Sequence, residues 1–260
     1  MVRNICLTIE YDGTRFCGWQ RQSRRTPGLK GANERFKTVQ EEIEKALEKL
    51  FRCKIRLIGA GRTDSGVHAE GQVANFKVSS ILPLRNIKRG LNSYLPKDIA
   101  VLSVRDASPS FHSRFNAKEK LYRYTIVNRD ARSPLLKRYA AFISYDLDIK
   151  AMRKAARYFI GKKDFKSFQA SDKKKKNSVR DLSKLDIVTK VPLIEIYIQA
   201  NGFLYNMVRN IVGTLIDVGR GRVAPEAVKK ILSKKHRPAA GGTAPAKGLS
   251  LVKVFYREGS

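Results

Sequence analysis

The chain of 260 residues carries 53 lysines and arginines against 23 aspartates and glutamates, a formal net charge of +30 at pH 7. Its hydrophobic content of 42% is sufficient for a packed core, which excludes a globally disordered chain. A positive excess of this size opposes compaction by self-repulsion, so it usually serves binding to a polyanion: RNA, DNA or an anionic membrane surface.

The membrane is the least supported of these partners. The first residues, 1–4, lead into a short alternating segment that lacks the apolar core of a signal peptide. The apolar run 211–216 ends at Asp217, far short of the roughly 20 residues that a spanning helix needs. We therefore expect a cytoplasmic protein with no membrane association.

Cysteines and histidines give no sign of a metal site. They are few and scattered, namely Cys6, Cys17, Cys53, His68, His112 and His236. No C-x-x-C pair, H-E-x-x-H motif or phosphate-binding G-x-x-x-x-G-K-[ST] loop occurs. We expect reduced thiols, no metal and no small-molecule cofactor.

The first part of the chain predicts the order strand, helix, strand, strand, helix, strand. Apolar residues alternate or repeat at helical spacing over residues 5–11, 38–50, 55–58, 74–78, 84–91 and 99–104. Thr38 and Glu41 form a capping-box pattern at the start of the first helix. This β-α-β-β-α-β order is typical of ferredoxin-like domains, which are common among RNA-binding proteins but not confined to them.

The second part is also mixed. Its pattern predicts strands over 121–127, 182–188, 194–200 and 249–255, and helices over 149–159, 204–216 and 225–232. We expect an α+β fold with two halves, residues 1–108 and 109–260. Two basic segments, 21–37 and 173–176, are predicted as loops, each either solvated or in contact with RNA.

The segment with the most chemical content is 59–69, GAGRTDSGVHA, a glycine-rich turn that carries Arg62, Asp64 and His68. Glycine permits backbone angles that other residues resist, so such a loop can hold a tight shape. Asp-Ser-Gly is also an ordinary turn sequence, and Asp64 could simply bond its own backbone. Residue types alone leave both interpretations open.

Ten short segments of the chain are distinctive. In chain order they are 11–20 (YDGTRFCGWQ), 38–40 (TVQ), 59–69 (GAGRTDSGVHA), 71–73 (GQV), 95–100 (LPKDIA), 111–115 (FHSRF), 122–124 (YRY), 164–168 (DFKSF), 206–213 (NMVRNIVG) and 248–251. Through these segments the chain resembles the TruA family of tRNA pseudouridine synthases along nearly its whole length. Each segment alone is weak, but together and in order they identify the family. The resemblance implies a pseudouridine synthase fold, in which two ferredoxin-like halves with antiparallel sheets flank a basic active-site cleft.

The resemblance also implies roles for four residues. Asp64 matches the catalytic aspartate, which acts as a nucleophile toward the sugar or as a base on it. Arg209 matches the arginine that pairs with this carboxylate, and Tyr122 the ring that packs against the target uracil. Arg62 matches a residue that fills the space left by the flipped nucleotide. Without the family, Arg209 would pass for a solvated cation and Tyr122 for a core residue.

By resemblance, the substrates are uridines at positions 38, 39 and 40 of the tRNA anticodon stem-loop, and the protein is a homodimer. Two alternatives remain: a non-catalytic RNA-binding protein, and a synthase acting on another RNA. The first lacks the K/R-G-F/Y-G/A-F-V-x-F/Y stretch of a single-strand-binding sheet. The long segment 21–37 and the high charge depart from the family pattern, and both bear on how RNA is held.

Overall fold

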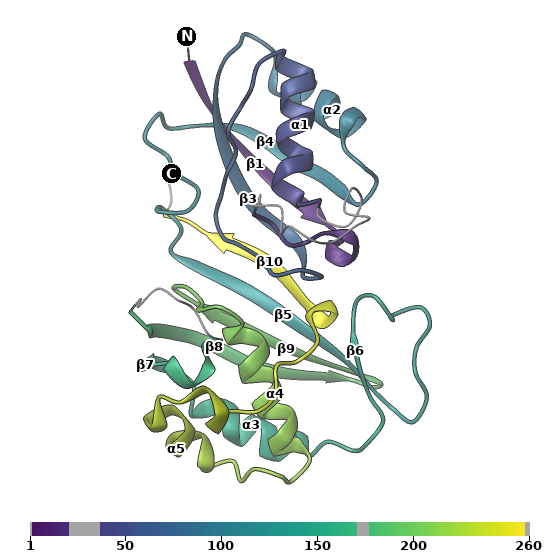
Figure 1. The fold of residues 1–260 in the computed structure, drawn as a ribbon, viewed down its shortest axis with the longest axis vertical. Coiled ribbons are helices and arrows are strands. Elements are labelled where there is room, and N and C mark those ends of the chain that lie inside the picture. Colours follow the sequence, from purple (N-terminus) through teal and green to yellow (C-terminus); the bar gives the residue numbers. More distant parts are fainter. Residues whose placement is uncertain (1, 21–36, 171–176, 258–260) are drawn as a thin grey trace, which may run out of the picture. The chain divides into compact units, whose positions relative to one another are not determined.

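The computed structural model describes residues 2–20, 37–170 and 177–257 (Figure 1). The predicted basic loops over 21–37 and 173–176 lie outside the described residues, except for Lys37. The chain forms two compact units, Met1–Lys118 with Leu251–Ser260, and Glu119–Ser250. The first unit thus extends ten residues beyond the expected boundary at residue 108 and takes in the end of the chain. No helix in the described part combines the length and apolar character needed to span a bilayer.

The first unit has the β-α-β-β-α-β order expected from its sequence. Its elements are β1 (Val2–Tyr11), the 3-10 helix η1 (Gly13–Arg15), α1 (Val39–Phe51), β2 (Ile58–Gly59), β3 (His68–Ser79), α2 (Leu84–Tyr94) and β4 (Ile99–Ala107). The strand order is β4-β1-β3, with β2 also pairing with β3, and all these pairs are antiparallel. The last strand, β10 (Leu249–Phe255), lies next to β3.

Helix α1 begins where the sequence predicts. Thr38 is its N-cap, and the Thr38 hydroxyl accepts the backbone N–H of Glu41 at 3.3 Å. The helix buries Val39, Ile43 and Leu47 completely, as expected for an apolar stripe that faces the core. Helices α1 and α2 pack side by side (Figure 1).

The predicted strand over 55–58 is wrong in extent, because β2 contains only Ile58 and Gly59. Side chains of α1 occupy the backbone groups that a longer strand would use. The N–H of Leu57 donates to Glu44 Oε1 at 3.1 Å, and its carbonyl accepts from Gln40 Nε2 at 3.0 Å. Buried backbone groups need a partner, and these two side chains satisfy them without a strand.

The second unit has a similar order of strand, helix, two strands and helix, with additional short elements. Its elements are β5 (Glu119–Asn128), β6 (Ala141–Ile143), α3 (Ile149–Arg157), β7 (Gly161–Asp164), η2 (Lys166–Phe168), β8 (Val179–Lys190), β9 (Leu193–Ala200), α4 (Met207–Gly219), α5 (Ala227–Lys234), η3 (Arg237–Ala239) and η4 (Ala246–Gly248). The antiparallel order β5-β9-β8 corresponds to β1-β3-β2, with β7 beyond β8 and β6 parallel to β5. The expectation of an α+β fold with two ferredoxin-like halves is therefore confirmed.

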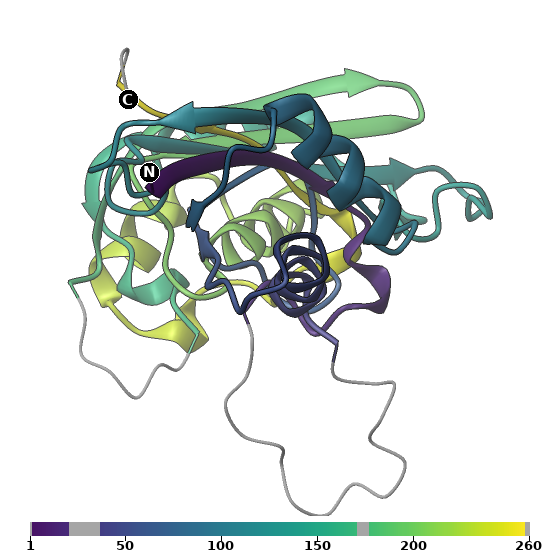
Figure 2. The same ribbon diagram turned by 90° about the horizontal axis from the view of Figure 1, so that it is seen from above.

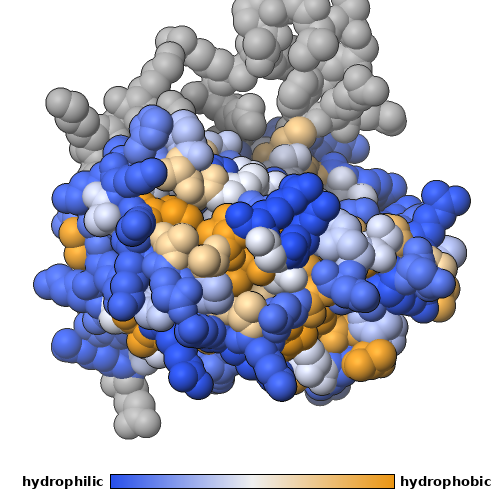
Figure 3. Space-filling model, turned by 90° about the horizontal axis from the view of Figure 1, so that it is seen from below, coloured by the Kyte–Doolittle hydropathy of each residue, from blue (hydrophilic) through white to orange (hydrophobic). Residues whose placement is uncertain are grey.

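Burial follows the predicted faces in the second unit. In β9, Ile194, Ile196 and Ile198 are buried while the residues between them are partly exposed, as a half-buried strand requires. Helices α3 and α5 bury an apolar side and expose lysines and arginines. On the face drawn in Figure 3, hydrophilic residues lie mainly around the edge, and apolar residues gather across the middle.

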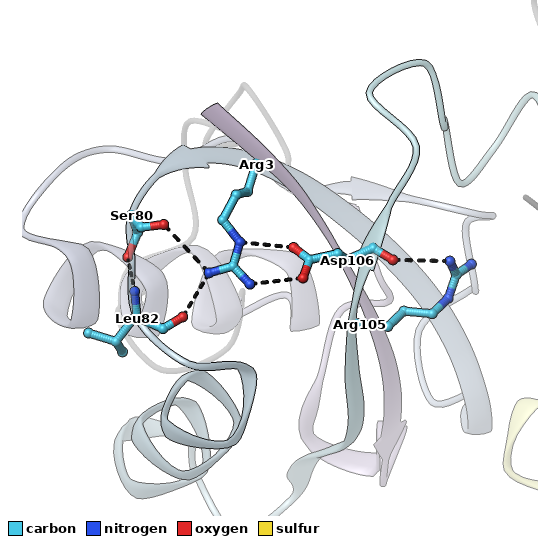
Figure 4. A network of polar contacts seen from close by, with 5 residues as sticks. All are labelled: Arg3, Ser80, Leu82, Arg105 and Asp106. Carbon is cyan, nitrogen blue, oxygen red and sulfur yellow. Dashed lines mark hydrogen bonds and ion pairs between the residues drawn. The ribbon is translucent and has the colours of Figure 1, made fainter. Parts of the chain in front are cut away.

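An ion pair links strands β1 and β4 of the first unit at one end. Arg3 of β1 makes a two-pronged contact with Asp106 of β4, at 2.9 and 3.0 Å, and donates to the carbonyl of Leu82 at 2.7 Å (Figure 4). The guanidinium of Arg3 lowers the pKa of Asp106 below its usual value. The strand that carries Arg3, β1, is curved along its length (Figure 2), as the right-handed twist of strands produces.

Candidate active site

Asp64 lies in the loop between β2 and β3, as the last residue of the GRTD motif. The Asp64 side chain is half-buried, Thr63 beside it is buried, and Arg62 is exposed. The loop closes in a tight turn, in which the Asp64 carbonyl accepts the N–H of Val67 at 3.1 Å. Gly66 makes this turn possible, because its φ of 77° is strained for residues with a side chain.

The segment 11–20 holds this loop from one side. The N–H of Trp19 donates to the Thr63 carbonyl at 3.1 Å, directly before Asp64. The carbonyl of Phe16 accepts from Ser65 Oγ at 3.2 Å and from the N–H of Gly66 at 3.4 Å, directly after it. The backbone on both sides of Asp64 is therefore fixed.

Two glycines allow this close approach. A Cβ atom on Gly18, whose φ is 82°, would lie 2.5 Å from the carbonyl oxygen of Thr63. A Cβ atom on Gly59 would lie 2.5 Å from Trp19 Cε2. Both distances are far below van der Waals contact, so only glycine fits. This explains why the YDGTRFCGWQ and GAGRTDSGVHA segments carry glycine where they do.

Side-chain hydrogen bonds complete the support. The buried hydroxyl of Tyr11 lies 2.8 Å from Thr63 Oγ1, and burial raises the pKa of Tyr11 well above its usual value. On the other side, Gln72 Nε2 donates to the carbonyl of Gly61 at 3.1 Å. Arg62 donates to Gln20 Oε1 at 2.6 Å. The backbone of the loop is thus preorganised by contacts from both sides.

Arg209 lies in the second unit, in the first turn of α4, and is half-buried. Its Nε donates to the carbonyl of Ala244 at 2.7 Å, and its Nη1 donates to Asn206 Oδ1 at 3.1 Å. The Arg209 carbonyl in turn accepts the N–H of Ala244 at 3.1 Å. The adjacent Pro245 carbonyl accepts from the hydroxyl of buried Tyr124 at 2.9 Å. The guanidinium is thereby held in one orientation.

Tyr122 lies on β5 and is 7% exposed. Its ring meets the ring of Phe203 edge to face, with centroids 5.1 Å apart and an interplanar angle of 86°. Phe203 belongs to the link between β9 and α4, close in sequence to Arg209. Our sequence reasoning did not single out Phe203. The aromatic pattern G-F-L-Y directly before NMVRN was the signal that could have identified it.

The four predicted site residues fall into two pairs. Arg62 and Asp64 share one loop of the first unit, whereas Tyr122 and Arg209 belong to β5 and α4 of the second unit. Within each unit, the residues around them are held by hydrogen bonds and ring contacts.

Comparison with known proteins assigns the chain to a family. Residues 7–116 and 155–257 match the family described as tRNA pseudouridine synthase. The chain belongs to the tRNA pseudouridine synthase family. The matched ranges include the Asp64 loop and Arg209, and they leave out Tyr122.

Relatives extend the similarity over almost the full chain. tRNA pseudouridine synthase A 2 of Clostridium perfringens is 44% identical over 255 residues, and tRNA pseudouridine synthase A of a Thermoanaerobacter species is 46% identical over the same length. The enzyme of that name from Acetivibrio thermocellus is 43% identical. In each case the match covers 98% of this chain and 100% of the relative. The protein is an enzyme of this family, an isomerase that converts uridine to pseudouridine in tRNA.

Proposed function

We propose that this enzyme forms pseudouridine at positions 38, 39 and/or 40 in the tRNA anticodon stem-loop, with Asp64 as its catalytic group. The observation that carries the proposal is the rigid support of the GRTD loop. Trp19 binds the carbonyl just before Asp64, and Phe16 binds the groups just after it. A backbone held in this way fixes the point from which the Asp64 carboxylate reaches the sugar.

The reaction conserves every atom. The N-glycosidic bond between C1′ and N1 breaks, the uracil rotates, a bond forms between C1′ and C5, and C5 loses a proton as N1 gains one. The Asp64 carboxylate either attacks the sugar as a nucleophile or removes a proton from it as a base. Substrate deuterated at C2′ separates the two, because removing that proton in the slow step would lower the rate several-fold.

The other three residues would assist this carboxylate. Arg209 would pair with Asp64 and favour its charged form, since a guanidinium close to a carboxylate stabilises the anion. Tyr122 would pack against the uracil, and Arg62 would occupy the space that the flipped nucleotide leaves. In support, Arg62 is exposed beside Asp64 and the Arg209 guanidinium is anchored by Ala244 and Asn206.

The assembly that we propose is a cytoplasmic homodimer that binds tRNA in a basic cleft. The formal charge of +30 supports a polyanionic partner, because each neutralised phosphate releases counterions and adds to affinity. The lysines and arginines on the exposed sides of α3 and α5 contribute to this charge.

Pseudouridine mapping tests the proposed substrate. Unmodified tRNA transcripts that carry a single uridine at position 38, 39 or 40 would be incubated with the enzyme, and modified sites would be detected by chemical labelling of pseudouridine. We expect modification at one or more of these positions and none with Asp64→Asn. Modification confined to other stems, or to other RNAs, would contradict the proposal while preserving the family assignment.

A further inference from the structure

We propose that residues 111–116 display His112 and Phe115 as a stacking surface for an unpaired RNA base, outside the Asp64 site. The proposal rests on the proposed function, because it takes the RNA to be the anticodon stem-loop of the tRNA substrate. Phe115 is 75% exposed, although burying an aromatic ring of this size would be favourable. The His112 and Phe115 rings lie against each other, with centroids 4.2 Å apart and planes 33° apart.

The exposure of Phe115 is imposed by a rigid segment. Ser113 is fully buried, its N–H donates to Asn75 Oδ1 at 2.9 Å, and its hydroxyl donates to the carbonyl of Ile58 at 2.5 Å. The hydroxyl of Tyr256 donates to the Ser113 carbonyl at 2.7 Å. These contacts come from β2, β3 and the C-terminal segment, so the middle of residues 111–116 is fixed to the core.

The half-buried His112 ring is held as well. The N–H groups of Arg114 and Phe115 both donate to His112 Nδ1, at 3.2 and 3.3 Å. The N–H of Asn116 donates to the His112 carbonyl at 3.0 Å, closing the turn. A prearranged aromatic surface loses little conformational entropy when a ligand stacks on it. The exposed Phe115 ring therefore contributes little to the stability of the fold and is well placed to bind a ligand.

The positive charge near Phe115 indicates which kind of partner would bind there. The guanidinium of Arg114 lies 5.8 Å from the Phe115 ring centroid, and Lys118 follows in the same unit. Aromatic rings interleaved with cations are the usual means of binding single-stranded nucleic acid, because every base has a face that can stack. An acidic protein surface would use the cations but has no general need of the paired rings.

The position of this surface connects it to the substrate RNA. Ile58, which accepts the Ser113 hydroxyl, directly precedes the glycine that begins the GAGRTDSGVHA segment. Residues 111–116 and the Asp64 loop are therefore supported by the same strand of the first unit. An RNA engaged at Asp64 has further unpaired bases in its anticodon loop, and we infer that one of them stacks on Phe115.

Binding of unmodified tRNA to Phe115→Ala tests the proposal. Removing a base-stacking ring is expected to raise Kd by roughly 5- to 150-fold. The dependence of Kd on salt should keep the wild-type slope, because no phosphate contact is lost, whereas Arg114→Ala should reduce that slope. Ile81→Ala is the matched control, since Ile81 is 98% exposed in the same unit and is not aromatic. It should bind like wild type.

Phe115→Trp gives a direct readout. The chain has one tryptophan, Trp19, which is 2% exposed, so the new indole would dominate the solvent-sensitive fluorescence. Anticodon stem-loop RNA should quench this fluorescence, and a fully paired RNA stem of equal charge should not. Quenching should persist when Asp64→Ala is added, which separates stacking from catalysis.

Three results would overturn the inference. The first is a Phe115→Ala enzyme whose Kd lies within twofold of wild type. The second is equal quenching by paired and unpaired RNA. The third is a change in sedimentation mass on Phe115→Ala with unchanged tRNA affinity, which would make this surface a contact between protein copies. Failure of Asp64→Ala to stop catalysis would contradict the proposed function and leave these three results unaffected.

Discussion

The indole of Trp19 lies against the backbone of Gly59, where a Cβ atom would meet Cε2 of the ring at 2.5 Å. Trp19 is 2% exposed and its ring centroid lies 6.0 Å from that of Tyr11. Tyr11 in turn contacts Thr63 through its hydroxyl. Two segments distant in sequence thus form one buried support. It contacts Gly59 and Thr63, on the N-terminal side of Asp64.

Gly59→Ala should disturb this support. Overpacking a core typically destabilises by about 1–3 kcal/mol, and a displacement of about 1 Å at a catalytic group can cost roughly 100-fold in rate. Urea unfolding and release of tritium from C5-labelled uridine in tRNA would measure the two effects. Gly242→Ala is the control, because a Cβ there meets nothing within 4 Å. Equal behaviour of both variants would show that the Trp19 contact does not position the loop.

Arg209→Lys should lower turnover strongly while the protein stays folded. Lysine keeps the charge but lacks the planar guanidinium, which donates to both the Ala244 carbonyl and Asn206 Oδ1. The charge is then no longer held in one orientation. We expect a fall in kcat of roughly 100-fold, similar to the loss of one oriented electrostatic contact. Thermal unfolding monitors the fold, and exposed Arg222→Lys is the matched control. Unchanged turnover would remove Arg209 from the site.

Phe203→Leu should affect kcat more than KM. The edge-to-face contact with Tyr122 contributes about 0.5–1.5 kcal/mol beyond simple burial, and without it the Tyr122 ring is held less firmly. Steady-state kinetics with tRNA should show kcat reduced several-fold, with KM nearly constant. Phe203→Tyr keeps the ring and should restore most of the rate. A rise in KM alone would assign Phe203 to RNA binding instead of positioning Tyr122.

Asp164 should make folding stability depend on pH. Burial alone would raise its pKa, but hydrogen bonds from Ser178, Lys235 and the backbone of Lys166 outweigh burial and lower it. A carboxylate with a lowered folded-state pKa stabilises the protein above its unfolded pKa of about 3.8 and loses that effect as pH falls through the folded value.

Asp164→Asn should therefore flatten the acid limb of the stability curve. Urea midpoints measured between about pH 6 and pH 2 should fall less steeply for this variant than for wild type. Because Asp164 is partly exposed, the difference at neutral pH should be only about 1 kcal/mol. Parallel curves for the two proteins would contradict the assigned hydrogen bonds. Asp148→Asn, at the N-cap of α3, is a control for the loss of a carboxylate elsewhere.

Local patterns predicted most of the fold. The hydrophobic repeat and Thr38 placed α1, and strict alternation placed β9, because these signals depend only on neighbours in sequence. The shortness of β2 could not be predicted, because Glu44 and Gln40 occupy its backbone groups from another element. The position of β10 beside β3 also depends on pairing between segments far apart in the chain.

The candidate site also combines features that local sequence indicates with features that depend on contacts between distant segments. The GRTD motif made Arg62 and Asp64 candidates, since both lie in one continuous segment. The contact of Trp19 with Gly59 and that of Tyr122 with Phe203 join residues 40 or more positions apart, so no local pattern indicates them. The extension of the first unit to Lys118 has a similar cause. Asn75 holds Ser113 in that unit through a buried hydrogen bond that composition does not indicate.

The most direct test follows tritium from C5 of labelled uridine in unmodified tRNA, with native enzyme and with Asp64→Ala. Forming the bond between C1′ and C5 must expel that hydrogen, so release reports the isomerisation itself. We predict release with the native enzyme and none with Asp64→Ala, while both proteins bind tRNA with similar affinity. Equal release by the two would contradict the assignment of Asp64 as the catalytic group.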